Sequence, residues 1–198
     1  MHPFDFHKDY ILENERAKLS PLSEAHFSAL FSVANHPDIW VYFLEKGLGE
    51  VAFQRYIQHA LQERESRLAY PFVVYDKLKS QFAGMTKLYE VNEQLSHVKL
   101  GHSWYGKAFQ GTRLNKNCKY LLFSFVFEQL KAERIGFGLD EQNIISKYAL
   151  KSVGCKEEGR LRSFLIHPNG KDRSDLILMS ILRAEWLNTS KQQLLQKL

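Results

Sequence analysis

A long apolar stripe in the middle of the chain constrains its fold more than any other feature. Apolar side chains recur there at intervals of three and four residues, at Leu114, Cys118, Leu121, Leu122, Phe125, Val126 and Leu130. This spacing places them on one face of a helix, so residues 114–130 are predicted to form an amphipathic helix. Polar residues fall on its other side, namely Lys116, Asn117, Lys119, Ser124 and Glu128.

The polar loop Gln110–Asn115 leads directly into this helix. The first turn of a helix leaves backbone N–H groups without intrahelical acceptors, and the aligned peptide dipoles make that end partly positive. An anion such as a phosphate satisfies both conditions. The alternative is a helix start that binds only water, and the loop by itself favours this alternative.

The length and composition indicate one globular domain. The chain has 198 residues, of which 44% are hydrophobic, so it can bury a sizeable core. No stretch approaches the ~20 apolar residues needed to span a bilayer. The first sixteen residues carry acids and lack an apolar run, which argues against a signal peptide and favours a cytoplasmic location.

The reactive and charged residues show no metal or nucleic-acid pattern. The two cysteines, Cys118 and Cys155, are predicted to be buried thiols. The eight histidines are not spaced like metal ligands, and His26, His36 and His59 are expected to have surface or capping roles. The net charge of +5 is mild and its residues are scattered, which favours a solvated surface over a nucleic-acid patch. A phosphorylated ligand would also benefit from this charge.

Strand-like and helical patterns follow one another along the chain. Strands are predicted at residues 16–22, 70–75, 81–91, 96–105, 134–140, 155–167 and 175–182. Further helices are predicted after Ser23, after Gly49 and over residues 143–153, where Gly154 ends the last one. Pro168-Asn169-Gly170-Lys171 predicts a hairpin turn between the last two strands. This order is typical of one α/β or α+β domain around a central sheet.

A series of short motifs occurs in order between Leu12 and Trp186. The motifs are residues 12–22, Gly101-His102-Ser103-Trp104, Gln110–Asn115, Asn143-Ile144-Ile145-Ser146, Val153-Gly154, residues 158–162 and Glu185-Trp186. Together they resemble the GNAT superfamily of acetyl-coenzyme-A-dependent N-acetyltransferases, and more closely its ribosomal-protein alanine and serine acetyltransferase subgroup. Residues 12–22 look like the first strand of that subgroup.

The resemblance implies a fold that can be tested. It predicts a single GNAT-like α/β (α+β) domain over residues 1–198, with a core of about 12–186 and a C-terminal extension of 187–198. The sheet is expected to be central, mixed and mostly antiparallel, with about seven strands and about four flanking helices. Two of the strands should splay apart to form a cofactor cleft.

The resemblance also assigns a site for acetyl-CoA or coenzyme A. The backbone N–H groups of residues 111–115 would hold the diphosphate, and the strand 103–105 would pair with the pantetheine arm. The cofactor-binding residues implied are Ser103, Trp104, Tyr105, Gln110, Gly111, Thr112, Arg113, Leu114, Asn115, Asn143 and Ser146. From the residues alone, Trp104 and Tyr105 could equally be core, and Asn143 could simply cap its helix with Ser146 in the first turn.

The loop departs from the family's form, Gln/Arg-x-x-Gly-x-Gly/Ala. Arg113 and Asn115 stand where glycine and glycine or alanine are usual. A non-glycine residue in a left-handed conformation costs ~1–2 kcal/mol. Two alternatives follow: the loop keeps ordinary φ and ψ angles, or Arg113 offsets the strain by adding charge next to the diphosphate.

The chemistry implied is acetyl transfer to an amine, with an N–H of the cofactor-binding strand meeting the developing oxyanion. Ser146 would protonate the departing thiolate, and His102 and Glu90 are candidate general bases, although each could be an ordinary strand side chain.

The preferred acceptor is a protein N-terminal α-amine, bound by loops such as residues 41–49 and 94–96. Alternatives are a small-molecule amine acetyltransferase and a non-catalytic CoA-binding regulatory module. Neither a metal, a nucleic acid nor a membrane is expected to take part, and the protein is expected to be a monomer or homodimer.

Overall fold

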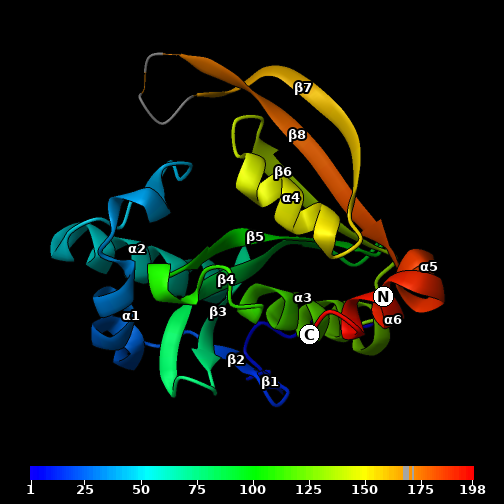
Figure 1. Cartoon of the computed structure of the whole chain (residues 1–198), viewed down its shortest axis with the longest axis horizontal. Coiled ribbons are helices and arrows are strands. Elements are labelled where there is room, and N and C mark those ends of the chain that lie inside the picture. The colour runs from blue at the N-terminus through cyan, green and yellow to red at the C-terminus, as the bar shows by residue number, and fades with distance from the viewer. Residues whose placement is uncertain (167–169, 171) are drawn as a thin grey trace.

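A continuous sheet organises the chain in the computed structural model, which describes residues 1–166, 170 and 172–198 (Figure 1). Within these residues eight strands lie in the order β1-β2-β3-β4-β5-β6-β8-β7. Their bounds are β1 Leu12–Glu13, β2 Ala17–Pro21, β3 Ala69–Asp76, β4 Gln81–Asn92, β5 His97–Tyr105, β6 Arg134–Asp140, β7 Lys156–Ile166 and β8 Arg173–Leu182. Neighbouring strands are antiparallel except β5 and β6, which are parallel. The predicted mixed, mostly antiparallel sheet is therefore confirmed.

The helices occur where the sequence predicts them, with additions at the C-terminal end. The α-helices are α1 Phe27–Ala34, α2 Glu50–Glu65, α3 Leu114–Ser124, α4 Ile144–Ser152, α5 Arg183–Glu185 and α6 Lys191–Leu195. Short 3-10 helices cover Glu24–His26, Pro37–Trp40 and Lys107–Phe109, and π-helical turns cover Phe125–Gln129 and Trp186–Ser190. The helix predicted over residues 114–130 is thus α3 followed by a π-helical turn.

Two hydrophobic cores cover opposite faces of the sheet. On β3, Tyr70, Phe72 and Val74 pack in the core that contains α3, whereas Val73 packs in the core that contains α1 and α2. Alternation along the strand produces this division, because successive strand side chains point to opposite faces. The C-terminal helix α6 lies beside α3, with Leu194 buried (Figure 1).

The start of the sheet differs from the prediction. The strand predicted at residues 16–22 is β2, but the stretch 12–22, which the resemblance likens to one first strand, forms two strands, β1 and β2, joined by a tight turn. The carboxamide of Asn14 causes the turn, because its Oδ1 accepts the backbone N–H groups of Arg16 (2.9 Å) and Ala17 (2.8 Å). The sheet therefore has eight strands in place of about seven.

The sheet splits between β5 and β6, as predicted. The two strands pair only at His97–Arg134, Val98–Ile135 and Lys99–Gly136. Beyond this point β5 stays paired with β4 as far as Tyr105, while β6 stays paired with β8 as far as Asp140. The edge of β5 that faces β6 consequently has no strand partner from Leu100 onward.

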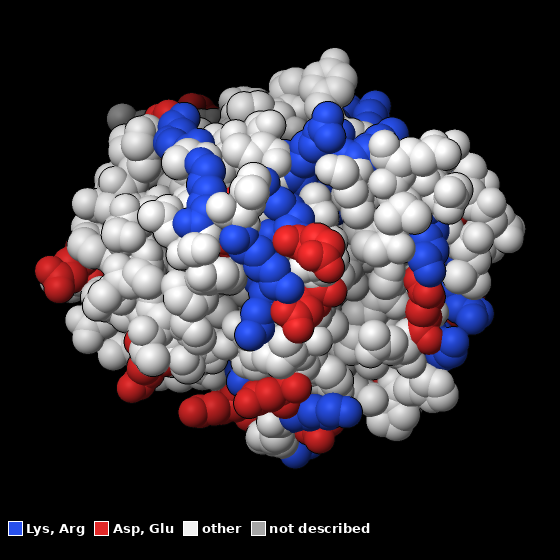
Figure 2. Space-filling view, turned by 60° about the horizontal axis from the view of Figure 1, so that its bottom comes forward, with Lys and Arg blue, Asp and Glu red and all other residues white. Residues whose placement is uncertain are grey.

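The last two strands form an arm that arches over α4 (Figure 1). The turn predicted between them is Pro168-Asn169-Gly170-Lys171, of which Pro168, Asn169 and Lys171 lie outside the described residues. On the face drawn in Figure 2, Lys and Arg side chains form narrow lines beside Asp and Glu, and no broad single-sign patch is visible. Within the described residues, none of the helices has the length and apolar character needed to cross a membrane.

Candidate functional site

A cavity of about 460 Å³ opens where β5 and β6 separate. Its walls combine the segment before α2, α2 itself, β4, β5, β6, α3, α4 and the β7–β8 arm. Five of the residues predicted for the site line it, namely His102, Ser103, Asn115, Asn143 and Ser146. The fold thus brings together residues from β5, from α3 and from the start of α4.

The start of α3 presents a run of unsatisfied backbone donors. Among the described residues, the N–H groups of residues 111–116 have no hydrogen-bond acceptor, and the first helical bond near this end is Asn117 N–H to Arg113 O at 3.2 Å. Six consecutive donors at a positive helix end form a favourable place for an anion. Gly111 supports the loop with φ +72°, and the space around its Cα is open. Gln110 and Thr112 instead hold the loop, with hydrogen bonds to Tyr105 O and Phe109 O.

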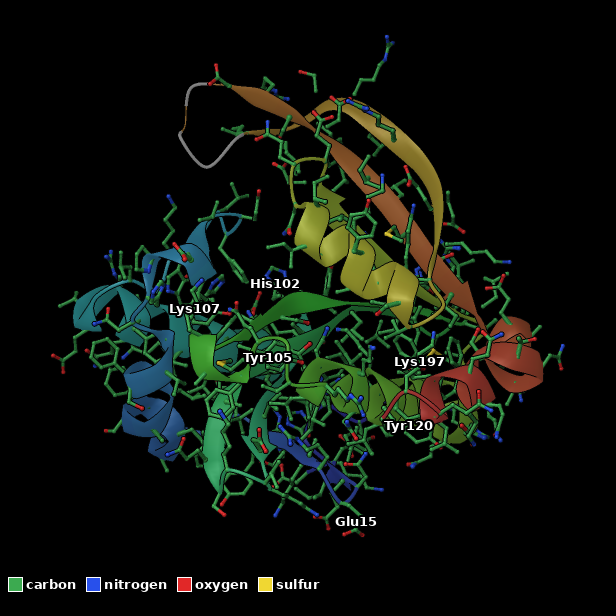
Figure 3. All side chains as sticks on the ribbon, viewed as in Figure 1. Glu15, His102, Tyr105, Lys107, Tyr120 and Lys197 are labelled. Atoms are coloured by element: carbon green, nitrogen blue, oxygen red, sulfur yellow. The ribbon has the colours of Figure 1, made fainter. Side chains whose placement is uncertain are left out.

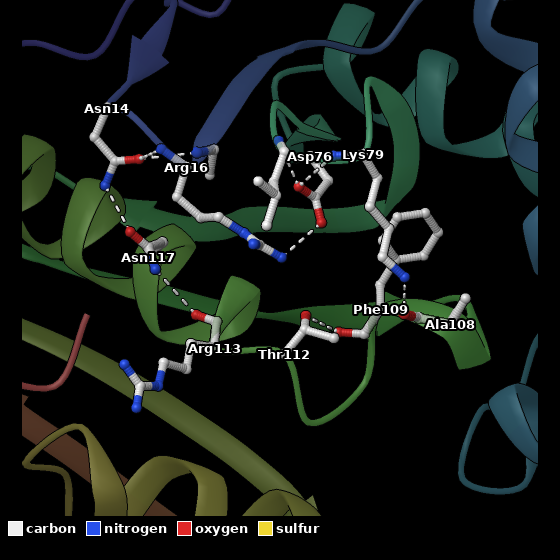
Figure 4. Close-up of polar contacts among 11 residues, drawn as sticks. Asn14, Arg16, Asp76, Lys79, Ala108, Phe109, Thr112, Arg113 and Asn117 are labelled. Atoms are coloured by element: carbon white, nitrogen blue, oxygen red, sulfur yellow. Dashed lines mark hydrogen bonds and ion pairs between the residues drawn. The ribbon is translucent and has the colours of Figure 1, made fainter.

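Arg113 adopts the left-handed conformation, with φ 65° and ψ −4°. The alternative of ordinary φ and ψ angles in this loop is therefore wrong. Buried Asn117 holds the strained residue, because its Nδ2 donates to Arg113 O at 3.2 Å and its Oδ1 accepts from Asn14 Nδ2 at 2.9 Å (Figure 4). The Arg113 side chain points away from this network, and its guanidinium has no hydrogen bond or ion pair among the described residues.

His102 lies in the cavity wall in an unusual backbone conformation. A register shift between β4 and β5 leaves His102 with φ 49° on β5. Figure 3 shows it on the side of β5 opposite Tyr105, and its ring lies 5.3 Å from Tyr89 and 6.4 Å from Phe43. The residue is exposed to solvent, but partial desolvation by these walls, reinforced by the nearby charge of Lys87, lowers the pKa of His102. Its imidazole is therefore neutral near pH 7 and can accept a proton.

Four other predicted residues lie outside the cavity wall. Glu90 does not line the cavity but forms an exposed ion pair with Lys99 at 2.6 Å, so the structure does not place it as a base. Trp104 is 3% exposed and donates to Tyr56 Oη at 3.2 Å, which makes its side chain part of the core. Tyr105 donates to Asn115 Oδ1 at 3.2 Å and thereby ties β5 to α3. Leu114 is also a core residue.

Asn143 is the N-cap of α4, since its Oδ1 accepts the Ser146 N–H at 3.0 Å. The capping role is therefore present in the structure, and the side-chain Nδ2 remains available for another partner in the cavity. Ser146 lies one turn into the same helix, also in the cavity wall.

Several cavity residues were missed by sequence reasoning. Glu63 of α2 pairs with buried Lys87 of β4, and His59 pairs with Glu45 at 2.7 Å. His59 thus faces the cavity, whereas His36 caps a 3-10 helix as expected. Lys119 and Asn117 were assigned to the polar side of the 114–130 helix, opposite its apolar stripe, but both are buried. No sequence signal identifies these contacts, because each partner comes from a distant element.

Cys118 and Cys155 are free and buried, as expected. In the part of the chain that the structure describes, no three His, Cys, Asp or Glu side chains are grouped as metal ligands would be.

Comparisons with known proteins point to one family. YdaF of Bacillus subtilis strain 168, a candidate ribosomal N-acetyltransferase, is 27% identical over 114 residues, which are 58% of this chain and 59% of that protein. The chain therefore matches somewhat more than half the length of this curated relative. A candidate acetyltransferase from T. thermophilus shares the fold over all of both chains, with 28% identity and a TM-score of 0.85.

More distant structures share the fold alone. Spermidine N-acetyltransferase from Vibrio cholerae, in complex with CoA and spermine, has 20% identity and a TM-score of 0.73 over 88% of this chain and 100% of that chain. Ribosomal-protein-S5-alanine acetyltransferase from Vibrio fischeri has 17% identity and a TM-score of 0.71 over 90% and 99%. Residues 16–156 match the acetyltransferase (GNAT) domain family, and the chain belongs to that family.

Proposed function

We propose that this protein is an N-acetyltransferase that uses acetyl-CoA to acetylate a primary amine. The observation that carries the proposal is that two unsatisfied backbone surfaces border the split in the sheet. One is the six N–H groups at the start of α3, and the other is the edge of β5 that β6 leaves unpaired. A diphosphate suits the first surface, and the amides of a pantetheine arm suit the second as a substitute strand. The fold neighbour that contains CoA supports this cofactor class.

Acetyl-CoA, when bound, supplies the acetyl group as a thioester. Two side chains of this protein are positioned to handle the protons that the transfer moves. The neutral imidazole of His102 can take a proton from the attacking amine as the C–N bond forms. The Ser146 hydroxyl can give a proton to the sulfur as the C–S bond breaks. A thiol with a pKa of about 8.5 leaves readily, so Ser146 contributes less than His102.

The proposed acceptor is a protein N-terminal α-amine. An α-amino group with a pKa of about 7.7–8.0 is partly neutral near pH 7, so it needs only modest help from a base such as His102. The relatives with ribosomal acetyltransferase names support this class. A small polyamine is the second candidate, because the fold neighbour from Vibrio cholerae is in complex with spermine and the exposed carboxylate of Glu45 lines the cavity and would attract a polycation.

Calorimetry with CoA and a thiol-release assay with acetyl-CoA test the proposal. The thiol-release assay is run with three kinds of acceptor. These are peptides with free N-termini, the same peptides with a blocked N-terminus and one internal lysine, and spermine. We expect CoA to bind and the free N-terminal peptides to react, while the blocked peptides do not. Turnover of spermine alone would support the second candidate, and CoA binding without any turnover would support a regulatory module. Absence of CoA binding would overturn the proposal.

A further inference from the structure

Lys119 is a buried cation in the cavity wall that the proposed mechanism does not yet use. It lies on α3, is 5% exposed, and its side chain reaches the region where β5 and β6 separate. Its Nζ donates to Ser103 Oγ of β5 at 3.1 Å and lies 5.9 Å from the ring centre of Phe137 on β6. Burying an ammonium group is costly, so its position calls for a compensating partner.

The polar partners of Lys119 are neutral. Ser103 Oγ is 2.7 Å from Thr86 Oγ1, which donates in turn to Gly101 O at 3.3 Å. The hydrogen bonds therefore run from Lys119 through two hydroxyl groups to a backbone carbonyl. This chain occupies one of the three N–H donors of the ammonium group.

No negative charge balances Lys119 within the described residues. No carboxylate oxygen there lies within 4.0 Å of its Nζ. The titratable groups that face it are the thiols of Cys118, on the same helix, and Cys155, which follows α4. Burial raises the pKa of both thiols to about 12, so both are neutral near pH 7. Burial also lowers the pKa of Lys119 to about 8, which still leaves it mostly protonated at pH 7.

We propose that Lys119 binds the acyl-CoA arm directly, by donating a hydrogen bond from its ammonium group to a carbonyl oxygen that lies between β5 and β6. The proposal rests on the proposed function, since it assigns a binding residue to the same cleft. A carbonyl oxygen accepts a charged hydrogen bond without bringing a second charge into the apolar surroundings of Phe137 and Leu150. Two carbonyl sources are available in such a ligand, the thioester and the pantetheine amides.

Calorimetry with CoA and acetyl-CoA on Lys119→Met, Lys119→Arg and Lys131→Met tests this role. Lys131→Met is the matched control, because it removes the same charge from an exposed residue beyond the far end of this helical segment, outside the cavity wall and away from the proposed diphosphate site. We expect Lys119→Met to bind about 10-fold to 100-fold more weakly, the range for a hydrogen bond to a charged group. Lys119→Arg should retain most of the affinity and Lys131→Met nearly all of it.

The two ligands distinguish the two carbonyl sources. If Lys119→Met loses affinity for acetyl-CoA alone, the acceptor is the thioester carbonyl. If it loses affinity for CoA equally, the acceptor is a pantetheine amide. Unchanged affinity for both ligands in folded Lys119→Met would overturn the proposal and leave Lys119 a structural residue. If the wild-type protein bound neither ligand, the proposed function itself would fail.

A measurement on the unmodified protein covers the case in which Lys119→Met does not fold. The pKa of Lys119 in isotope-labelled wild-type protein can be followed by NMR at its Cε, with and without CoA. A hydrogen bond to a ligand carbonyl stabilises the charged form, so we expect the pKa to rise on binding. Burial by the ligand without such a bond would lower the pKa, and a lowered or unchanged value would overturn the proposal.

Discussion

At the scale of single residues, His102 and Arg113 are non-glycine residues held at positive φ beside the proposed acetyl-CoA site. Such a conformation costs of the order of 1–3 kcal/mol and persists only where the surroundings hold it. For Arg113 the holding contacts come from Asn117, whose amide bonds to the Arg113 carbonyl. For His102 they come from the bulged pairing of β5 with β4. Positive φ by itself is not a site signal, because surface residues such as Ser80 and Lys131 share it.

Arg113→Gly separates the strain of this residue from its charge. Because glycine tolerates positive φ, we expect the substitution to raise the free energy of unfolding by about 1 kcal/mol. We also expect weaker CoA binding, since the free guanidinium is lost from the anion-binding end of α3. The loss in affinity should shrink as salt is raised and the wild-type charge is screened. Thermal unfolding and calorimetry at two salt concentrations measure both effects.

Lys131→Gly is the matched control for this experiment. It also removes one positive charge from an exposed residue at positive φ, but at the opposite end of the helix that begins at Leu114. It should stabilise the fold without changing CoA affinity. Tighter CoA binding by Arg113→Gly at every salt concentration would contradict the prediction and show that the arginine is a steric burden.

His102→Gln should change the pH dependence of turnover. The lowered pKa of His102 means that the wild-type base is neutral above that pKa and is lost as the pH falls through it. Protonation of an α-amine substrate already reduces kcat/KM below about pH 8. For the wild type, the plot of log(kcat/KM) against pH should therefore steepen from slope one to slope two below the pKa of His102. The plot for the variant should keep slope one. General-base catalysis contributes roughly 10²–10⁴-fold, so kcat should fall within that range.

The control for His102 is His59→Gln, which alters another histidine of the cavity wall. His59 is paired with Glu45 on the more exposed side of the cavity. The pH profile of kcat/KM for His59→Gln should therefore keep the steep acid limb of the wild type. A steep acid limb that persists in His102→Gln would show that another group is the base.

At the scale of elements, the start of α4 combines a structural role and a proposed binding role in Asn143. Its Oδ1 caps the helix, while its Nδ2 is left for a partner in the cavity. Asn143→Ala should lower the free energy of unfolding by about 0.5–2 kcal/mol, through loss of the cap, and should also weaken CoA binding.

Asn143→Ser isolates the binding role. Serine caps a helix about as well as asparagine, so the melting temperature should stay near that of the wild type. Serine lacks the amide donor, so CoA affinity should still fall. Full CoA affinity in both variants, with a lower melting temperature for Asn143→Ala alone, would leave Asn143 as only a cap.

At the scale of the whole molecule, α3 is the element on which distant parts of the chain converge. The His2 N–H donates to Leu130 O at 2.6 Å, at the end of the π-helical turn that follows α3, and the Asn14 amide donates to Asn117 near the start of α3. At the C-terminal side, Trp186 Nε1 and Lys191 Nζ both bond to Glu128. These contacts anchor the helix whose first turn forms the proposed diphosphate site.

Hydrogen exchange with and without CoA tests the arrangement of the whole site. We expect protection on residues 110–117 and on the unpaired edge of β5, residues 100–105, because a bound ligand would occupy donors that are free in the apo protein. Residues 97–99 already pair with β6 and serve as an internal reference with little change. Protection that spared 110–117 and appeared elsewhere would place the ligand outside the cleft.

The sequence by itself determined the pattern of strands and helices, because apolar spacing of two or of three to four residues reflects one local geometry in every context. Motif order also predicted that His102, Asn143 and Ser146 belong to one site, and in the structure all three line the same cavity. The sequence did not reveal the two strands in residues 12–22, where a single side chain, Asn14, turns the backbone.

Only the tertiary structure decided which polar residues belong to the cavity. Periodicity shows which side of a helix is polar, but it does not show what covers that side. The polar side of α3 is covered by the β1–β2 turn and by the split sheet, so Asn117 and Lys119 become buried. Glu90, by contrast, lies on a strand of the same sheet yet pairs with Lys99 away from the cavity. Tertiary packing decides such cases, because the partner of each group lies on another element of the fold.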